Sequence, residues 1–97
     1  MKTLVMGGTR FNGLHLVQEL VRCGHIVSIL NRGVTEAPVP REVRRLYADR
    51  KDPQRLKEVL GPEEFDVIFD TSAYVLEDVQ SLVDIFEGRA GHYIFAS

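Results

Sequence analysis

A glycine-rich segment near the amino terminus is the part of this sequence best suited to bind an anion. Its residues are Gly7, Gly8, Thr9, Arg10, Phe11, Asn12 and Gly13. Gly7 would form a tight turn after an apolar run, and Gly13 would let the following helix pack close to a strand. The backbone N–H groups near Phe11 and Asn12 would then face a pyrophosphate, aided by the positive end of the helix. We therefore expect dinucleotide binding here rather than a purely structural turn.

A second pair of polar residues follows the next apolar run, roughly 20 residues beyond the glycine segment. Asn31 and Arg32 stand where a protein that binds NAD usually has an acidic residue for the ribose 2′-hydroxyl. A carboxylate would repel a 2′-phosphate, whereas the guanidinium of Arg32 would pair with it. We therefore expect NADP to be preferred over NAD. The alternative interpretation is that Arg32 is an ordinary polar loop residue.

Apolar runs rich in β-branched residues alternate with segments of helical spacing, and these predict the elements that position both groups. We predict strands over residues 3–6, 26–30, 43–48, 66–70 and 93–96, and helices over residues 13–23, 53–60 and 75–86. Gly24 would end the first helix, because glycine accepts the left-handed conformation there. Asp52 and Pro53 would begin the second helix as its N-cap and first residue, and Gly61 would end it.

The strand pattern predicts an α/β fold with a parallel sheet. The strands are continuously apolar, which indicates burial on both faces of the sheet. The right-handed crossover rule then favours a Rossmann-like doubly wound sheet of five strands in the order 3-2-1-4-5. The strand over residues 43–48 is the most polar, so we place it near a sheet edge.

The composition is that of one globular domain. The chain has 97 residues, of which 44% are apolar and 27% charged. No apolar run approaches the roughly 20 residues that a membrane span needs, and the amino terminus lacks the features of a signal peptide. A net charge of −2 gives no overall attraction to nucleic acid or to an anionic membrane. The single cysteine, Cys23, fits a reducing compartment, so we expect a cytoplasmic protein with a packed thiol.

The glycine segment also resembles a known family. Gly-Gly-Thr-Arg-Phe-x-Gly is similar to the amino terminus of extended and atypical short-chain dehydrogenases/reductases of the epimerase/dehydratase superfamily. Gly7 and Gly13 match the first and third glycines of that family's Gly-x-x-Gly-x-x-Gly pattern, and Arg10 stands where the second belongs. Such an arginine occurs in a subgroup that includes proteins similar to chloroplast stem-loop-binding proteins. Its guanidinium would reach a cofactor phosphate or remain solvated on an exposed loop.

The resemblance implies further cofactor contacts at the carboxyl ends of the later strands, where ligands bind in such sheets. Asp49, followed by Arg50, would contact the adenine amino group; the alternative is that Asp49 caps the turn before the helix over residues 53–60. Thr71, Ser72 and Ala73 would line the cofactor between pyrophosphate and nicotinamide; the alternative is a polar loop leading into the next helix.

The family's proton chemistry uses a tyrosine and a lysine four positions apart on one helix, with a serine on the preceding strand. Tyr47 and Lys51 have this spacing, but Tyr47 falls in a predicted strand, where the spacing does not align two side chains. We therefore expect no catalytic residue in this chain, with Ser97 at most the start of the family's serine-rich strand end. Residues 1–97 would form the amino-terminal, NAD(P)-binding portion of an epimerase/dehydratase-like oxidoreductase, inactive alone. The full-length parent would act on a sugar nucleotide or another small substrate, and the resemblance implies that later helices build most of the family's dimer contacts.

Other polar groups support weaker interpretations. The three histidines, His15, His25 and His92, have no paired spacing, so a metal site is not expected. A basic cluster consists of Arg41, Arg44, Arg45, Arg50 and Lys51. Nearby acidic residues dilute it, so we expect a solvated sheet edge rather than a nucleic-acid surface. The alternative function is a non-catalytic protein of the same fold that binds a nucleotide or RNA.

Overall fold

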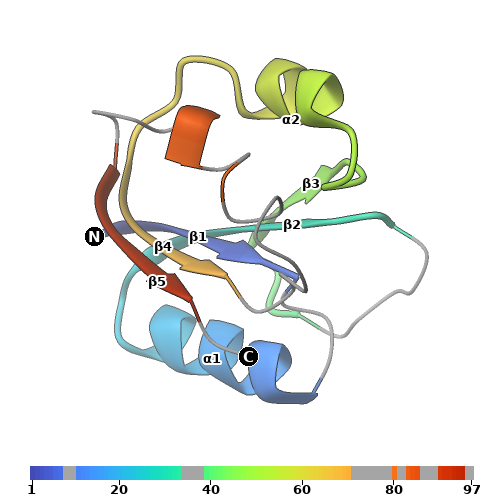
Figure 1. Cartoon of the computed structure of the whole chain (residues 1–97). Helices are drawn as coiled ribbons and strands as arrows, with labels where there is room; N and C mark the ends of the chain where they lie inside the picture. Colours follow the sequence, from blue (N-terminus) through green and yellow to red (C-terminus); the bar gives the residue numbers. More distant parts are fainter. Residues whose placement is uncertain (8–10, 34–38, 71–79, 81–82, 86–89, 96–97) are drawn as a thin grey trace.

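Five parallel strands form the centre of the molecule, which the computed structural model describes over residues 1–7, 11–33, 39–70, 80, 83–85 and 90–95. The elements are β1 (Lys2–Met6), α1 (Phe11–Arg22), β2 (Ile26–Asn31), β3 (Arg44–Tyr47), α2 (Pro53–Leu60), β4 (Phe65–Asp70) and β5 (Ala90–Phe95). Figure 1 shows the two helices on opposite sides of the sheet.

The strand order is β3-β2-β1-β4-β5, and every neighbouring pair is parallel. The predicted order and the predicted edge position of β3 are therefore confirmed. Met6 is at the centre, because it pairs with Leu30 of β2 on one side and with Asp70 of β4 on the other. The chain reverses its winding direction between β1 and β4, and ligands of such sheets bind outside the carboxyl ends of the strands at that point.

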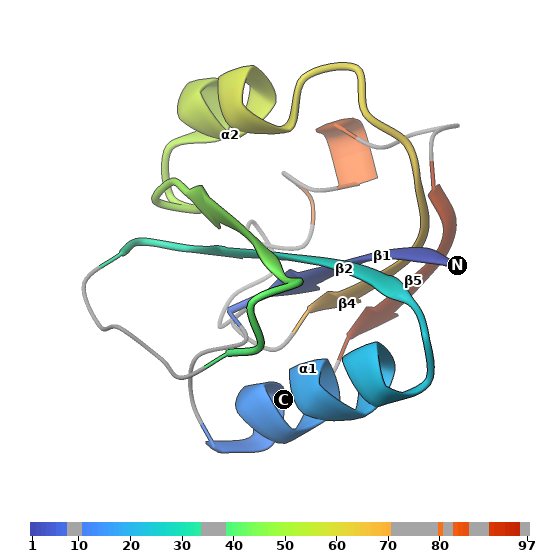
Figure 2. The same ribbon diagram turned by 180° about the vertical axis from the view of Figure 1, so that it is seen from behind.

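The two faces of the sheet carry separate apolar cores, as the continuous apolar strands predict. Leu4 and Met6 pack in the core that contains Leu56 of α2, whereas Val5 packs in the core that contains Val17 of α1. Alternate residues of one strand point to opposite faces, which explains this division. Figure 2, seen from behind, shows the same three layers. The fold is thus the predicted Rossmann-like doubly wound sheet.

Most element bounds lie within one residue of the predictions, but two elements begin earlier by two residues or more. α1 begins at Phe11 rather than Gly13, because apolar spacing locates a helix but does not fix its first residue. β5 begins at Ala90 rather than residue 93, since pairing with Phe65 of β4 extends it through residues of low strand propensity. Of the predicted helix over 75–86, residues 80 and 83–85 are described, and they are helical.

Three predicted helix boundaries are confirmed: the end of α1 at Gly24 and both ends of α2. Gly24 has φ of +86° and follows the end of α1. At α2, the Asp52 carboxylate accepts a hydrogen bond from the Arg55 N–H at 3.1 Å, and Pro53 is the first helical residue. Gly61 follows α2 with φ of +57°. The cap at Asp52 therefore places the start of α2 directly after the turn that contains Asp49.

A charged cluster near the amino ends of the strands holds Glu63 between two cations. Glu63 forms ion pairs with Lys2 Nζ at 2.9 Å and with Arg44. Partial burial alone would raise the pKa of Glu63, but hydrogen bonds and charges from Arg44 and Lys2 outweigh it and lower the pKa below 4.5. The ionised carboxylate therefore stabilises the fold above the unfolded-state pKa, and that contribution is lost as the pH falls through the lowered value.

Glu63→Gln is expected to destabilise the chain near neutral pH and to have a much smaller effect in acid. The reason is that protonated Glu63, like glutamine, no longer carries the charge that Arg44 and Lys2 stabilise. Urea unfolding at about pH 7 and about pH 3 measures this difference. Glu64→Gln, at the exposed neighbouring carboxylate, is the control and should leave the pH profile unchanged. An equal loss of stability for Glu63→Gln at both pH values would contradict the assignment.

Candidate functional site

The carboxyl end of β1 turns sharply at Gly7. Gly7 has φ of +94°, a conformation that other residues adopt only with strain, and its N–H donates to the Leu30 carbonyl oxygen at 2.8 Å. Gly7 therefore has the conformation that the predicted tight turn requires, and it lies directly beside the end of β2. Gly8, Thr9 and Arg10 are outside the described residues.

The first turn of α1 follows this glycine turn and contains Phe11, Asn12 and Gly13. The first N–H groups of a helix have no partner within it, so they are available to an anion. The first turn carries no acidic residue, which leaves the positive end of the helix uncompensated. Gly13 is buried, as expected for a residue that lets the helix approach the sheet. These features are those that an anion-binding helix start requires, and binding of a phosphate group here stays a prediction.

The end of β2 bends in a turn built by Asn31. The Asn31 side-chain oxygen Oδ1 accepts the Gly33 N–H at 2.7 Å, and the Asn31 carbonyl oxygen accepts the Ala48 N–H at 2.9 Å. Arg32 is exposed between them. Since Gly7 bonds to Leu30, the structure brings the predicted glycine turn and the predicted ribose-binding residues to the same edge of the sheet. Their contact with a cofactor stays a prediction.

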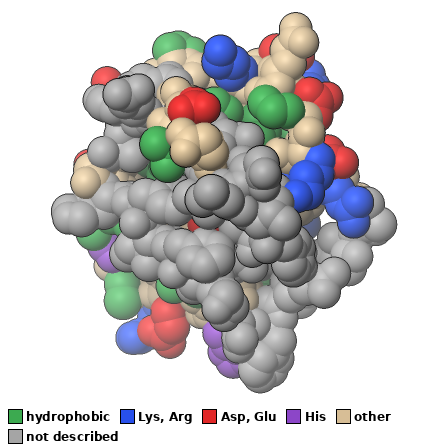
Figure 3. Space-filling view, in the orientation of Figure 1, with side chains coloured by type: hydrophobic (Ala, Val, Ile, Leu, Met, Phe, Trp, Pro, Cys, Tyr) green, Lys and Arg blue, Asp and Glu red, His purple; other side chains and the backbone are tan. Residues whose placement is uncertain are grey.

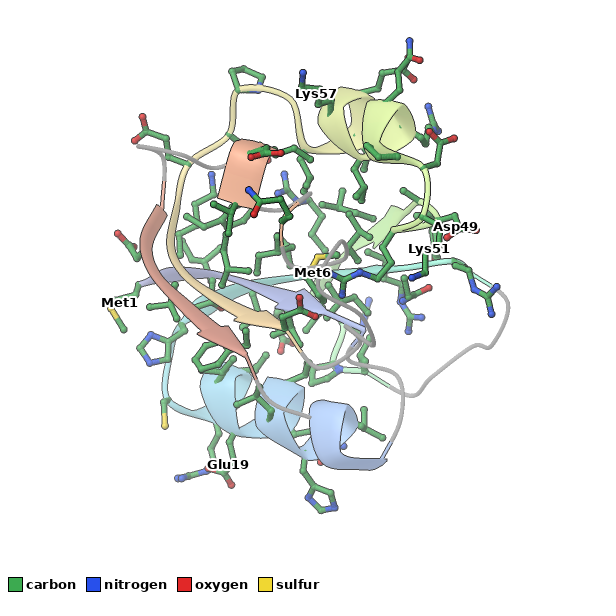
Figure 4. The ribbon with its side chains drawn as sticks, viewed as in Figure 1. Met1, Met6, Glu19, Asp49, Lys51 and Lys57 are labelled. Carbon is green, nitrogen blue, oxygen red and sulfur yellow. The ribbon has the colours of Figure 1, made fainter. Side chains whose placement is uncertain are left out.

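Asp49 caps its own turn after β3. Its Oδ1 accepts the Lys51 N–H at 2.9 Å, and its carbonyl oxygen accepts the Asp52 N–H at 2.9 Å. Figure 4 shows the labelled Asp49 and Lys51 side by side beyond β3, while Met6 lies near the middle of the molecule. The structure thus shows the turn-cap role; the adenine contact of the exposed Asp49 side chain stays a prediction.

Arg50 is buried, which corrects its expected place in a solvated basic cluster. Its Nη1 and Nη2 donate to Asp70 Oδ1 at 2.6 Å and to Asp70 Oδ2 at 2.9 Å, and the two side chains are 9% and 0% exposed. This bidentate ion pair connects the loop after β3 to the last residue of β4. Sequence reasoning missed Asp70 as a partner, although a carboxylate that ends an apolar strand was the available signal. Whether Arg50 contacts a cofactor stays a prediction.

The other members of the basic cluster differ among themselves. Arg41 and Lys51 are exposed, as expected for a solvated edge. Arg44 forms an ion pair with Glu63 and donates from Nε to Ser28 Oγ at 3.1 Å. Figure 3 shows Lys and Arg side chains interspersed with Asp and Glu on the visible face. The described part of this face is therefore of mixed charge.

Tyr47 lies in β3 and Lys51 in the turn before α2, so the two do not share a helix. Cys23 is exposed rather than packed, because it lies beyond the last residue of α1 and not on its apolar side. Thr71, Ser72, Ala73 and Ser97 are outside the described residues.

Within residues 1–7, 11–33, 39–70, 80, 83–85 and 90–95, no three His, Cys, Asp or Glu side chains are grouped so that they could hold a metal ion. Over the same ranges, none of the helices has both the length and the apolar character that a membrane crossing requires.

Comparison with known proteins identifies relatives of the whole described sheet. Residues 3–90 match the sequence model of the NAD dependent epimerase/dehydratase family. The chloroplast stem-loop binding protein of 41 kDa b of Arabidopsis thaliana is 32% identical, over 99% of this chain and 29% of that protein. This chain therefore spans less than a third of that relative's length.

Solved structures of epimerases share the fold. UDP-glucose 4-epimerase of Thermotoga maritima, crystallised with UDP-glucose, has a TM-score of 0.85 and 17% identity, over 100% of this chain and 38% of that one. UDP-glucose 4-epimerase of Thermus thermophilus, in complex with NAD, has a TM-score of 0.76 and 21% identity, over 92% of this chain and 34% of that one.

Proposed function

The chain belongs to the NAD dependent epimerase/dehydratase family, and we propose that it binds a nicotinamide dinucleotide, with NADP preferred over NAD. The observation that supports this proposal is the conformation of Gly7, which ends β1 with φ of +94° and donates its N–H to Leu30 at the end of β2. A helix start without acidic residues offers N–H groups and a positive dipole end to a pyrophosphate.

The preference for NADP rests on the end of β2. Asn31 and Arg32 provide no carboxylate to hold a ribose 2′-hydroxyl, and the exposed guanidinium of Arg32 is available for a 2′-phosphate. The Asn31 carboxamide is uncharged and its oxygen accepts the Gly33 N–H, so the charge at this position comes from Arg32. Asp49 and the segment 71–73 would complete the contacts along the sheet edge.

This chain would supply binding rather than turnover. When bound, the nicotinamide ring supplies the hydride chemistry, and the protein supplies its placement. In our proposal the proton-transferring serine, tyrosine and lysine lie beyond residue 97 of a longer oxidoreductase, which acts on a sugar nucleotide or another small substrate. The chain spans 29% of the Arabidopsis relative, which leaves room for such a part.

Titration of the chain with NADPH and NADH tests the proposal. We expect NADPH to bind about tenfold more tightly, since a charge-assisted contact with the 2′-phosphate exceeds roughly 1.4 kcal/mol. Arg32→Glu should abolish this preference, because its carboxylate repels the 2′-phosphate and can accept the ribose hydroxyl. Arg41→Glu makes the same charge change at another exposed arginine, and it should preserve the preference.

The possible outcomes separate the two parts of the proposal. Equal affinity for the two nucleotides, or tighter NADH, would overturn the assignment of Arg32. A chain that binds neither nucleotide would overturn dinucleotide binding itself. If Arg41→Glu and Arg32→Glu act alike, the preference comes from overall charge and not from a contact at Arg32.

The second candidate is a non-catalytic protein of this fold that binds RNA. The name of the Arabidopsis relative, a stem-loop binding protein, favours it. The ion pairs of Arg44 with Glu63 and of Arg50 with Asp70 count against it, because they neutralise two arginines of the only basic cluster in the sequence. We therefore rank it below dinucleotide binding, and failure of both nucleotides to bind would favour it.

A further inference from the structure

We propose that Tyr47 positions Arg32 for the 2′-phosphate by holding the turn in which Arg32 lies; this rests on the proposed function. Tyr47 does not touch the cofactor in this proposal. It acts through Gly33, the residue after Arg32, and so sets the discrimination between NADP and NAD.

Hydrogen bonds fix the backbone of this turn on both sides of Arg32. Before it, Asn31 bonds to Ala48 of the chain leaving β3. After it, Gly33 has φ of +75°, and its N–H returns to the Asn31 side chain at 2.7 Å. The backbone of Arg32 is thus held between two fixed residues, which restricts the directions that its side chain can take.

The Tyr47 ring lies against this turn. Tyr47 pairs with Asn31 in the ladder between β2 and β3. A Cβ atom placed on Gly33 would lie 2.9 Å from Tyr47 Cδ1 and 3.3 Å from Cε1, so the ring occupies the space that a side chain at position 33 would need. The three atoms nearest to that Cβ position are all ring carbons of Tyr47. The ring therefore covers the turn and opposes its opening.

Core packing does not account for this aromatic residue. Tyr47 is 49% exposed and belongs to neither apolar core. Its neighbour Leu46 packs against the core on the α2 side, as a strand residue of the opposite orientation does. We therefore infer that the role of the Tyr47 ring is its contact with Gly33.

When the turn around Arg32 is held in one conformation, binding of the 2′-phosphate is favoured. An arginine with few accessible directions loses less conformational freedom when it binds, and guanidinium–phosphate pairing depends on direction. Without the ring, the turn would relax and Arg32 would pair less well with the 2′-phosphate. Binding of NADH, which lacks that phosphate, would change little.

The test compares Tyr47→Thr with Tyr47→Phe. Threonine retains strand propensity but removes the ring, whereas phenylalanine retains every ring carbon that faces Gly33. We expect Tyr47→Thr to lower the ratio of NADPH to NADH affinity about fivefold and Tyr47→Phe to preserve it. Gly33→Ala, which pushes the ring away, should lower the ratio in the same way. Because a ratio is compared, a partial loss of folded protein does not alter the result.

A double-mutant cycle identifies the route of the effect. In an Arg32→Gln background, Tyr47→Thr should cause no further change in the ratio, because the residue that it positions is gone. If the unmodified chain prefers NADPH but Tyr47→Thr retains that preference, or if Tyr47→Phe loses it equally, the role of Tyr47 is wrong. If the unmodified chain shows no preference, the assignment of Arg32 fails first. The two failures are therefore distinguishable.

Discussion

Arg50→Ala is expected to lower the free energy of unfolding by about 3–5 kcal/mol, because it leaves the Asp70 carboxylate buried without its bidentate ion-pair partner. Asp70→Ala should have a similar effect, since it leaves the buried guanidinium of Arg50 without that carboxylate. The side chains are 9% and 0% exposed, so water cannot readily replace the lost partner. Urea or thermal unfolding measures the change.

Replacement of both partners together should recover most of that loss. In Arg50→Met combined with Asp70→Leu, two apolar side chains of similar size fill the space and no buried charge remains. The exposed pair of Arg55 and Glu58 is the control: Arg55→Ala removes an ion pair at 3.3 Å and should change stability little. If Arg50→Ala is tolerated as well as Arg55→Ala, the pair is hydrated in solution and its burial is wrong.

The same variants report on the sheet edge. Arg50 follows Asp49 in the chain, and Asp70 precedes the segment 71–73, so the ion pair connects two of the predicted cofactor-binding segments. The variant with Arg50→Met and Asp70→Leu therefore separates the effect of the ion pair on stability from its effect on the placement of these two segments. A stable variant with weakened dinucleotide binding would indicate that the directional contact, and not the fold alone, aligns these segments.

Leu4→Ala is expected to destabilise the chain by about 2–5 kcal/mol, because it opens a cavity in the core between the sheet and α2. Leu4 and its core neighbours Leu56 and Ile68 are each 0% exposed. Ile26→Ala is the control, since Ile26 is 68% exposed and its truncation removes little packing. Denaturant unfolding of the two variants gives the comparison. Equal effects at the two positions would contradict the packing of α2 on this face.

The sequence alone determined the strand order, the helix boundaries at Gly24, Asp52 and Gly61, and the positive φ of Gly7. These features depend on local rules: apolar runs predict buried parallel strands, an Asp-Pro pair begins a helix, and glycine accepts a positive φ. The right-handed crossover then leaves few topologies. The same local rules placed Tyr47 in a strand and so excluded it from a catalytic pair with Lys51.

Only the tertiary structure decided how distant residues meet. Arg50 and Asp70 are 20 positions apart, and only the parallel ladder from β3 to β4 brings the turn after one strand to the end of another. The contact of Tyr47 with Gly33 likewise requires β2 and β3 to pair in one register. The exposure of Cys23 depends on where α1 ends. Such contacts arise from strand register and packing, which neither residue type nor spacing along the chain specifies.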